Sequence, residues 1–323
     1  MSAPAALARH TAAGRICPVD YRYAPADLNR APDLTAEILY VVGGLYGNLA
    51  ALRRIEWLAW RERAPVTIVF NGDFHWFDAE TEWFAAIEKG VTRHRAIRGN
   101  VETEIARAGD IGAGCGCAYP ECVDDGVVTR SNAILNELRA VARAEATARL
   151  SALPMHLVAN VGDLRVGIVH GDAAALAGWR FAPDALDERA NATWLADVRA
   201  RSGIDLFAST HTCLAALRDF DTPAGRLAVI NNGSAGMANF SRSTFGLISR
   251  IATRPCPHPR AYGTNVGDVF VDAVPVDYDL AEFLARFGAR WPAGSAAHAS
   301  YHQRITGGPS FTIEQASGHV RAT

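Results

Sequence analysis

Runs of apolar residues alternate with helix-like patterns in the first part of the chain. Residues 38–42 and 66–70 are short apolar runs, whereas apolar residues recur every three or four positions over 48–63. A similar helical pattern covers residues 80–89, and residues 93–97 are typical of a further strand. Strands that alternate with helices in this way predict an α/β fold.

The rest of the chain predicts more strands and helices. Residues 155–159 and 164–169 flank a turn at Gly162 and indicate a β-hairpin. The tail beyond Gly294 is rich in Ala, Ser and Gly. We further expect a polar helix over 131–150, a helix over 184–201, strands over 204–208, 214–220, 227–231 and 269–276, and a helix over 280–287.

Composition and charge narrow the classes of function. The chain has 323 residues, of which 49% are hydrophobic and 20% charged, as in ordinary globular proteins. A net charge of −2 without long Lys or Arg runs argues against general binding to nucleic acid or to an anionic membrane. The apolar runs are too short to span a bilayer, and residues 1–13 lack a signal-peptide pattern. We therefore expect a cytoplasmic location and leave homo-oligomer formation open.

Polar residues follow several of the predicted strands. Asp73 and Asn100 come after strands in the first part of the chain, and His170 and His211 come after two later strands. Ligands bind beyond the carboxyl ends of strands in open α/β sheets, so these side chains are expected to converge. Carboxylate, amide and imidazole ligands suit a divalent transition metal such as Mn, Zn, Fe, Co or Ni. One such residue alone is more often a turn residue or a buried histidine, but four at strand ends predict a metal site.

These residues lie in four of five segments whose order and approximate spacing resemble the motifs of the calcineurin-like metallophosphoesterase superfamily: residues 41–48, 71–73, 98–100, 169–172 and 209–213. Residues 231–236 also resemble that family's Asn-Pro-Gly-Ser turn, with Asn232 in place of Pro. The resemblance covers residues 38–236. It implies an α/β fold with four layers, αββα, in which two mixed sheets lie face to face between helices.

The resemblance also implies roles for single residues. It makes Asp73 the carboxylate that bridges two metal ions, and Asn100, His170 and His211 complete the second ion's site. In the first ion's site, Gly44 and Tyr46 stand where the family has an Asp-x-His pair, and Cys213 replaces a second His. One metal ion is therefore expected, and a second stays undecided.

A further departure concerns the position after Asn100. The family usually has a His there, which contacts substrate and assists the leaving group, whereas this chain has Val101 followed by the expected Glu102. A single metal ion can still act as a Lewis acid and lower the pKa of bound water. Hydrolysis with one ion is thus chemically feasible.

Two residues could restore the first ion's site. His75 lies two positions after Asp73 and could place a ring nitrogen there, and Cys213 could bind an ion as its thiolate. The alternatives are that His75 contacts substrate or packs beside Trp76, and that Cys213 is a buried thiol that fills space.

Other residues near the motifs have expected supporting roles. Tyr46 could donate a hydrogen bond to a phosphate oxygen, and Arg98 could help to hold the substrate. Arg98 and Asp172 could also support the ligands from outside, because a metal-bound His commonly donates its other N–H to a carboxylate or carbonyl group.

A Gly- and Cys-rich stretch, residues 109–126, follows Asn100 and is expected to be a loop or small insertion that folds over the site. Cys115, Cys117 and Cys122 could hold a second metal ion or form a redox cluster, with Cys213 as a further ligand. A cap loop with reduced thiols is the alternative. Two aromatic and basic segments, residues 17–23 and 300–304, are interpreted as packing or surface elements, with a substrate clamp as the alternative.

These features together predict residues 1–35 as an N-terminal extension, 36–275 as a metallophosphoesterase domain, and 276–323 as a C-terminal helix and tail on the same domain. The expected function is a metal-dependent phosphoesterase that acts on a small phosphomonoester or nucleotide-like substrate. A non-catalytic descendant that binds a metal or a phosphorylated ligand, as a sensor or scaffold, is the alternative. A third interpretation keeps two metal ions with altered ligands.

Overall fold

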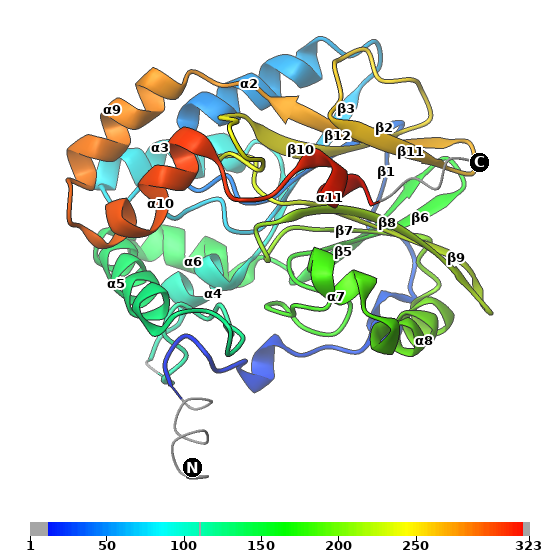
Figure 1. Ribbon diagram of the computed structural model, residues 1–323, viewed down its shortest axis with the longest axis horizontal. Helices are drawn as coiled ribbons and strands as arrows, with labels where there is room; N and C mark the ends of the chain where they lie inside the picture. Colours follow the sequence, from blue (N-terminus) through cyan, green and yellow to red (C-terminus); the bar gives the residue numbers. More distant parts are fainter. Residues whose placement is uncertain (1–11, 110, 319–323) are drawn as a thin grey trace.

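The computed structural model describes residues 12–109 and 111–318, and its two six-stranded sheets pack face to face (Figure 1). The first sheet has the order β1 (Leu34–Thr35), β5 (His156–Val161), β6 (Leu164–Val169), β7 (Leu206–Ser209), β9 (Gly225–Asn232), β8 (Ala215–Thr222). The second has the order β11 (Tyr262–Val266), β12 (Val269–Val276), β10 (Gly246–Ala252), β2 (Ile38–Val42), β3 (Val66–Asn71), β4 (Arg95–Ile97). Both sheets are mixed: β2, β3 and β4 pair parallel, as do β6, β7 and β9, whereas β10 and β12 pair antiparallel.

Strand β2 shows why its sequence is an unbroken apolar run. Leu39 and Val41 belong to the core between the two sheets, whereas Ile38, Tyr40 and Val42 belong to the core under the outer helices. Successive side chains of a strand point to opposite faces, so a strand covered on both faces has no polar alternation. All five residues are buried.

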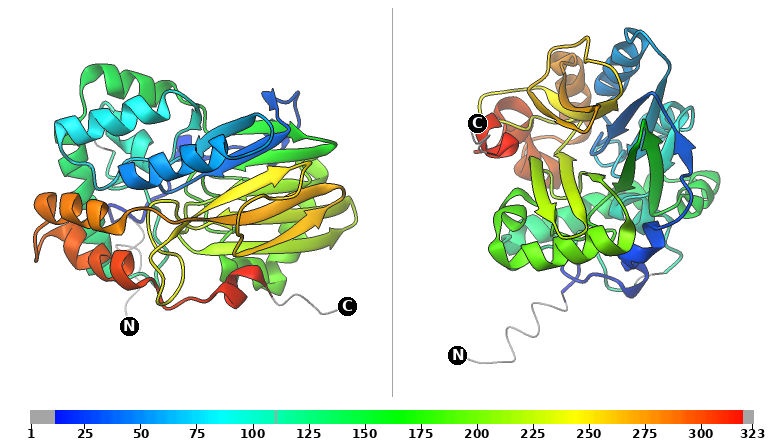
Figure 2. Two further views of the ribbon diagram at one scale, coloured as in Figure 1. Left: turned by 90° about the horizontal axis from the view of Figure 1, so that it is seen from above. Right: turned by 90° about the vertical axis from the view of Figure 1, so that its right-hand side faces the viewer.

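Helices form the two outer layers. Helix α2 (Leu49–Trp60) packs on the second sheet beside α3 (Thr81–Val91) and α9 (Leu280–Arg290). Helices α7 (Pro183–Asp187) and α8 (Ala192–Ser202), with the short 3-10 helices η2 (Pro25–Leu28) and η3 (Arg189–Asn191), cover the first sheet (Figure 2). The expected four-layer αββα sandwich is confirmed.

Several elements differ from their predicted form. The helix expected over 131–150 is two helices, α5 (Asp125–Val141) and α6 (Ala144–Ala152), because Ala142 is extended and turns α6 towards α4 (Asn100–Ala106). The helix expected over 184–201 is likewise interrupted at Glu188, which is extended. Strands β10 and β11 and helix α4 were not predicted. The Ala-rich tail contains α10 (Ala296–Gly307) and α11 (Ile313–Ser317).

The C-terminal elements contact the central part of the fold, with α9 against α2, α10 against α5, and α11 against β8. At the other end, η1 (Val19–Tyr21) lies in the predicted N-terminal extension, of which residues 1–11 fall outside the described residues. The proposed domain boundaries stay predictions. None of the described helices is long and apolar enough to cross a membrane.

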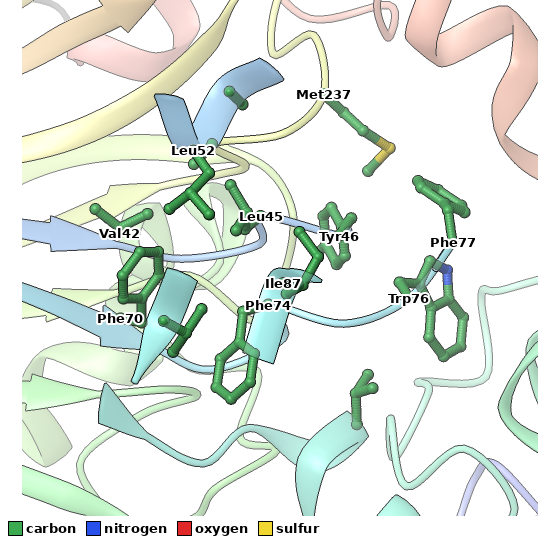
Figure 3. Close-up of a cluster of buried hydrophobic side chains, with 14 of the residues drawn as sticks. Val42, Leu45, Tyr46, Leu52, Phe70, Phe74, Trp76, Phe77, Ile87 and Met237 are labelled. Carbon is green, nitrogen blue, oxygen red and sulfur yellow. The ribbon is translucent and has the colours of Figure 1, made fainter. Parts of the chain in front are cut away.

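The core under the outer helices extends to the edge where the motif residues lie. Figure 3 shows Val42 and Phe70, near the ends of β2 and β3, at one side of this cluster, Trp76 and Phe77 at its other side, and Tyr46 between them. Each of these side chains is at most 4% exposed. The loops that carry the candidate site are therefore anchored in the hydrophobic core.

Candidate metal site

The four predicted ligands follow parallel strands of both sheets. Asp73 lies just beyond β3, Asn100 begins α4 after β4, His170 directly follows β6, and His211 lies just beyond β7. Parallel strands present their carboxyl ends at one edge of a sheet, and the face-to-face packing brings the two edges together. The structure therefore gathers all four side chains at one place, where each is at most 5% exposed.

The ligand atoms converge on Nε2 of His170. That nitrogen lies 3.0 Å from Oδ1 of Asn100, 3.2 Å from Nδ1 of His211 and 3.4 Å from Oδ1 of Asp73. Ligands about 2.1 Å from a shared ion lie about 3.0 to 3.4 Å apart in octahedral or tetrahedral geometry. Among the described residues, Asp73, His170 and His211 form the one group of three or more His, Cys, Asp or Glu side chains that is close enough to hold an ion.

Backbone carbonyl groups orient the ligands. Nδ1 of His170 lies 2.8 Å from the carbonyl oxygen of Asn71, and Nε2 of His211 lies 3.1 Å from that of Cys117. A ring nitrogen that donates to a carbonyl leaves the other nitrogen with a lone pair for an ion. The amide nitrogen of Asn100 donates to the carbonyl oxygen of Cys115, at 2.9 Å, so its Oδ1 faces the other ligands.

Close backbone packing places Asp73 and His170 next to each other. Asp73 has a left-handed φ of 52°, a strained conformation for a non-glycine residue. A Cβ atom on Gly99 would lie 2.3 Å from Oδ1 of Asp73 and 2.8 Å from Cε1 of His170. Only glycine leaves enough room at this position.

Glu102 holds the loop that carries Asp73. Its Oε2 accepts from the backbone N–H groups of Asp73 and Gly99, each at 2.8 Å, and its Oε1 accepts from those of Phe74 and His75 at 3.0 and 3.3 Å. Burial and the nearby Asp73 raise the pKa of Glu102 to about 7. The sequence identified Glu102 only as the expected motif residue after Val101. Its bonds to the loop of Asp73 are visible only in the structure.

Burial and the neighbouring side chains shift the pKa values of the titratable residues in the cluster. Burial raises the pKa of Asp73, but His170 and His211 outweigh it and keep that pKa below its ordinary value. Burial lowers the pKa of His170, but the neighbouring Asp73 has the larger net effect and raises that pKa above its ordinary value. Burial and the neighbouring His170 lower the pKa of His211 to about 3. His211 is therefore a neutral imidazole at neutral pH, which is the form that binds metal ions.

Tyr46 and Cys213, two of the replacements in the first ion's site, contact each other. The Tyr46 hydroxyl oxygen lies 2.7 Å from the Cys213 sulfur, and both residues have left-handed φ angles, of 53° and 58°. Burial raises the pKa of Tyr46 well above its ordinary value, and burial also raises the pKa of Cys213. Each side chain therefore keeps its proton at neutral pH and is occupied by the other. Metal binding by Cys213 and substrate binding by Tyr46 stay predictions.

The structure does not bring His75 into the cluster. Its Nδ1 lies 2.5 Å from Oδ2 of Asp78, its Nε2 lies 3.1 Å from Oε1 of Glu88, and its ring stacks on Phe84 with centroids 3.8 Å apart. Both ring nitrogens are thus engaged by carboxylates. The side chain is buried in this network and not directed at the metal ligands, which favours the packing alternative.

Arg98 and Asp172 have other partners than those expected. Nη1 of Arg98 donates to the carbonyl oxygen of Ser151, in the last turn of α6, at 3.2 Å. Asp172 accepts from the backbone N–H groups of Ala174, Ala175 and Arg180, and so it fixes its own loop. The carbonyl group of Asn71, and not Asp172, takes the expected place beside His170.

The Gly- and Cys-rich stretch closes over the ligands. Cys115 and Cys117 are buried with their sulfur atoms 2.9 Å apart, and the Cys117 sulfur lies 3.4 Å from the Asn100 amide nitrogen. Cys122 is exposed, and no group of three potential ligands among the described residues includes these cysteines. The loop contributes carbonyl oxygens that orient Asn100 and His211, and its thiol chemistry stays a prediction.

A cavity of about 250 Å³ opens beside Asp73 and His211. Its wall includes Tyr301 and Arg304 of α10, so the segment 300–304 lies at the site and not on a remote surface. The segment 17–23 supports the site from behind, since the Tyr21 hydroxyl group donates to Oε1 of Glu104 in α4 at 2.7 Å. In the sequence, the aromatic and basic character of residues 300–304 was the only indication that this segment could contact a substrate.

Solved structures provide the comparison for this geometry. A metallophosphoesterase from Sphaerobacter thermophilus is 15% identical, the match covers 84% of this chain and 100% of that one, and the TM-score is 0.50. The chain has the metallophosphoesterase fold. A hypothetical protein from Pyrococcus horikoshii OT3 is similar as well, with 18% identity, coverage of 85% and 99%, and a TM-score of 0.57. No protein-family model matches the sequence, and no curated protein does.

The resemblance drawn from the five segments is thus confirmed for the fold. The four candidate ligands lie together at one edge of this fold, and Asp73, His170 and His211 among them form a group that is close enough to hold a metal ion.

Proposed function

We propose that this chain is a metal-dependent phosphoesterase that uses one divalent transition metal ion to hydrolyse a small phosphomonoester. The observation that carries the proposal is the convergence of Asp73, Asn100, His170 and His211. Oδ1 of Asp73, Oδ1 of Asn100 and Nδ1 of His211 lie 3.0 to 3.4 Å from Nε2 of His170, while the other ring nitrogen of each histidine and the amide nitrogen of Asn100 bond to backbone carbonyl groups. Acceptors at this spacing repel each other unless a cation or a proton lies between them.

The residues fit such an ion in number, type and spacing. Imidazole nitrogens with carboxylate and amide oxygens suit Mn, Zn, Fe, Co or Ni. A bound ion would supply Lewis acidity and a water molecule of lowered pKa. Asp73 is the only carboxylate among the four residues, so the loaded site carries a net positive charge that favours an anionic phosphate group.

The chain's own residues have separate tasks in this proposal. The carbonyl groups of Asn71 and Cys117 hold the two histidine rings in their ligand tautomers, and Glu102 fixes the loop of Asp73. The cavity beside Asp73 and His211 gives the substrate access from one side. These residues position the ligands before substrate arrives, so little reorganisation is needed during reaction.

The test is hydrolysis of p-nitrophenyl phosphate by the full chain, purified without metal and then supplied with each metal in turn. We expect turnover with at least one metal, and Asp73→Asn and His211→Gln should lower kcat/KM by a factor of about 100 or more. Gln303→Ala, on the exposed side of α10, is the matched control and should keep full activity. Absence of turnover with every metal, in protein that binds metal, would overturn the proposal.

One observation favours a second function, a non-catalytic descendant that binds a metal or a phosphorylated ligand. Val101 is buried and apolar where a proton donor to the leaving group is expected, and Tyr46 and Cys213 form a neutral pair. A protein of this kind would bind one metal ion and phosphate without turnover. The hydrolysis assay, with metal content measured on the same protein, separates the two functions, because a non-catalytic protein would bind metal while hydrolysis is absent with every metal.

A further inference from the structure

The cavity beside the metal site has aromatic walls. Trp76, Tyr119, Trp179 and Tyr301 line it, and they come from four separate segments of the chain. The rings support one another: Tyr301 meets Trp76 at 6.3 Å between centroids, and Trp179 meets Tyr119 at 6.1 Å. Its volume of about 250 Å³ is below the roughly 300–1,000 Å³ of sites for drug-sized ligands. The cavity therefore suits a compact ligand with a flat apolar part.

Arg304 provides a fixed positive charge on the same wall. Its Nη2 donates to the carbonyl oxygen of Cys213 and its Nε donates to that of Ala238 at 3.3 Å. These bonds hold the guanidinium group against the loop that also carries His211. Arg304 is the only Arg or Lys among the described residues that line the cavity. A guanidinium group binds phosphate oxygens through paired N–H groups.

The other polar groups of the cavity wall would not repel an anion bound beside Arg304. Asp73 is the only acidic residue among the described wall residues, and an ion bound to it would neutralise its charge. The side chains of Tyr46 and Cys213 bond to each other beside it. With a metal ion bound to Asp73 and His211, an anionic group between that ion and Arg304 would thus meet positive charge on both sides, and the aromatic rings belong to the same wall.

We propose that this cavity selects phosphomonoesters of a compact aromatic alcohol, with Arg304 on the phosphate group and the aromatic walls around the ring of the leaving group. This inference rests on the proposed function and adds the class of substrate to it. A ring gains from contact with aromatic faces and edges, whereas a short alkyl group gains much less. Arg304 thereby supplies positive charge on the side of the site where Tyr46 and Cys213 replace metal ligands.

The test compares phenylphosphonate with methylphosphonate, which share the anionic group and cannot be hydrolysed. Their affinities are measured by tryptophan fluorescence on the full chain, both Mn²⁺-loaded and EDTA-treated. We expect phenylphosphonate to bind the loaded protein about tenfold or more tightly than methylphosphonate. Tyr301→Leu should weaken phenylphosphonate alone, Arg304→Gln should weaken both about tenfold, and Arg304→Lys should restore part of the loss. Gln303→Ala should leave both affinities unchanged.

The outcomes separate this inference from the proposed function. Melting temperature and metal content identify any variant that has lost its fold. Equal affinities for the two phosphonates, or an Arg304→Gln protein that is folded and binds both normally, would overturn the inference even if the wild type hydrolyses aryl phosphates. A clear preference for phenylphosphonate without turnover would support the cavity's selectivity while the proposed catalysis fails.

Discussion

Replacement of His75 by Gln should make the stability of the protein less dependent on pH. The His75 ring is fully buried between Asp78 and Glu88, and it stacks on Phe84. Burial lowers the pKa of His75, but the two carboxylates outweigh it and raise that pKa to about 10. An imidazolium ion thus persists in the folded protein at pH values where the unfolded chain, with a His pKa of about 6.5, has lost the proton.

The sign and size of the effect follow from this difference. Since the folded pKa of His75 is the higher one, its contribution to stability is complete below about pH 6.5 and is lost as pH rises towards 10. Within that window the free energy of unfolding falls by about 1.4 kcal/mol per pH unit. Between pH 7 and 9.5 the wild type should therefore lose about 3 kcal/mol relative to His75→Gln.

The assay is urea unfolding, followed by tryptophan fluorescence at several pH values between 6 and 10. His298→Gln, which changes a half-buried ring on α10, is the control and should follow the wild type. We expect His75→Gln to retain its metal content, because neither ring nitrogen of His75 reaches the metal ligands. A free-energy difference between wild type and His75→Gln that is constant with pH would refute the buried ion-pair network. Loss of metal from His75→Gln would instead indicate that His75 is a metal ligand.

The other predictions concern the backbone and side chains around the ligands. Gly99→Ala should lower metal affinity and cost about 1–3 kcal/mol of stability, because the added methyl group collides with Asp73; metal titration and urea unfolding measure this. Glu102→Ala leaves four backbone N–H groups without their acceptor, and we expect a loss of about 3 kcal/mol or more, whereas Glu102→Gln should recover part of it in the same unfolding assay. Tyr46→Phe removes one hydrogen bond to Cys213, so thermal unfolding should show a loss of about 1 kcal/mol while metal content stays unchanged.

The sequence predicted many of the strands and the candidate ligand cluster from local patterns, and the four layers from the resemblance to the metallophosphoesterase motifs. Fully apolar runs such as residues 38–42 identify strands covered on both faces, and the residues just after parallel strands share one edge of the fold. Asp73, Asn100, His170 and His211 could therefore be brought together without knowledge of the turns between them.

The remaining features depend on contacts between distant parts of the chain. His75 lies two positions from Asp73, but Glu88 on α3 determines where its ring lies. Tyr46 and Cys213 are separated by 167 positions, and no sequence pattern indicated that they bond to each other. Arg304 belongs to a helix in an Ala-rich tail with a weak helical pattern, so the sequence indicated a substrate clamp at residues 300–304 only as the alternative to a packing or surface element.

The number of metal ions bound per chain tests the central claim most directly. The full chain is loaded with Mn²⁺ or Zn²⁺, freed of excess metal and analysed for metal content beside its Asp73→Ala and Cys213→Ala variants. One intact site predicts about one ion per chain, lost in Asp73→Ala and kept in Cys213→Ala. Two ions per chain, with one of them lost in Cys213→Ala, would contradict the account, as would a folded wild type that binds none.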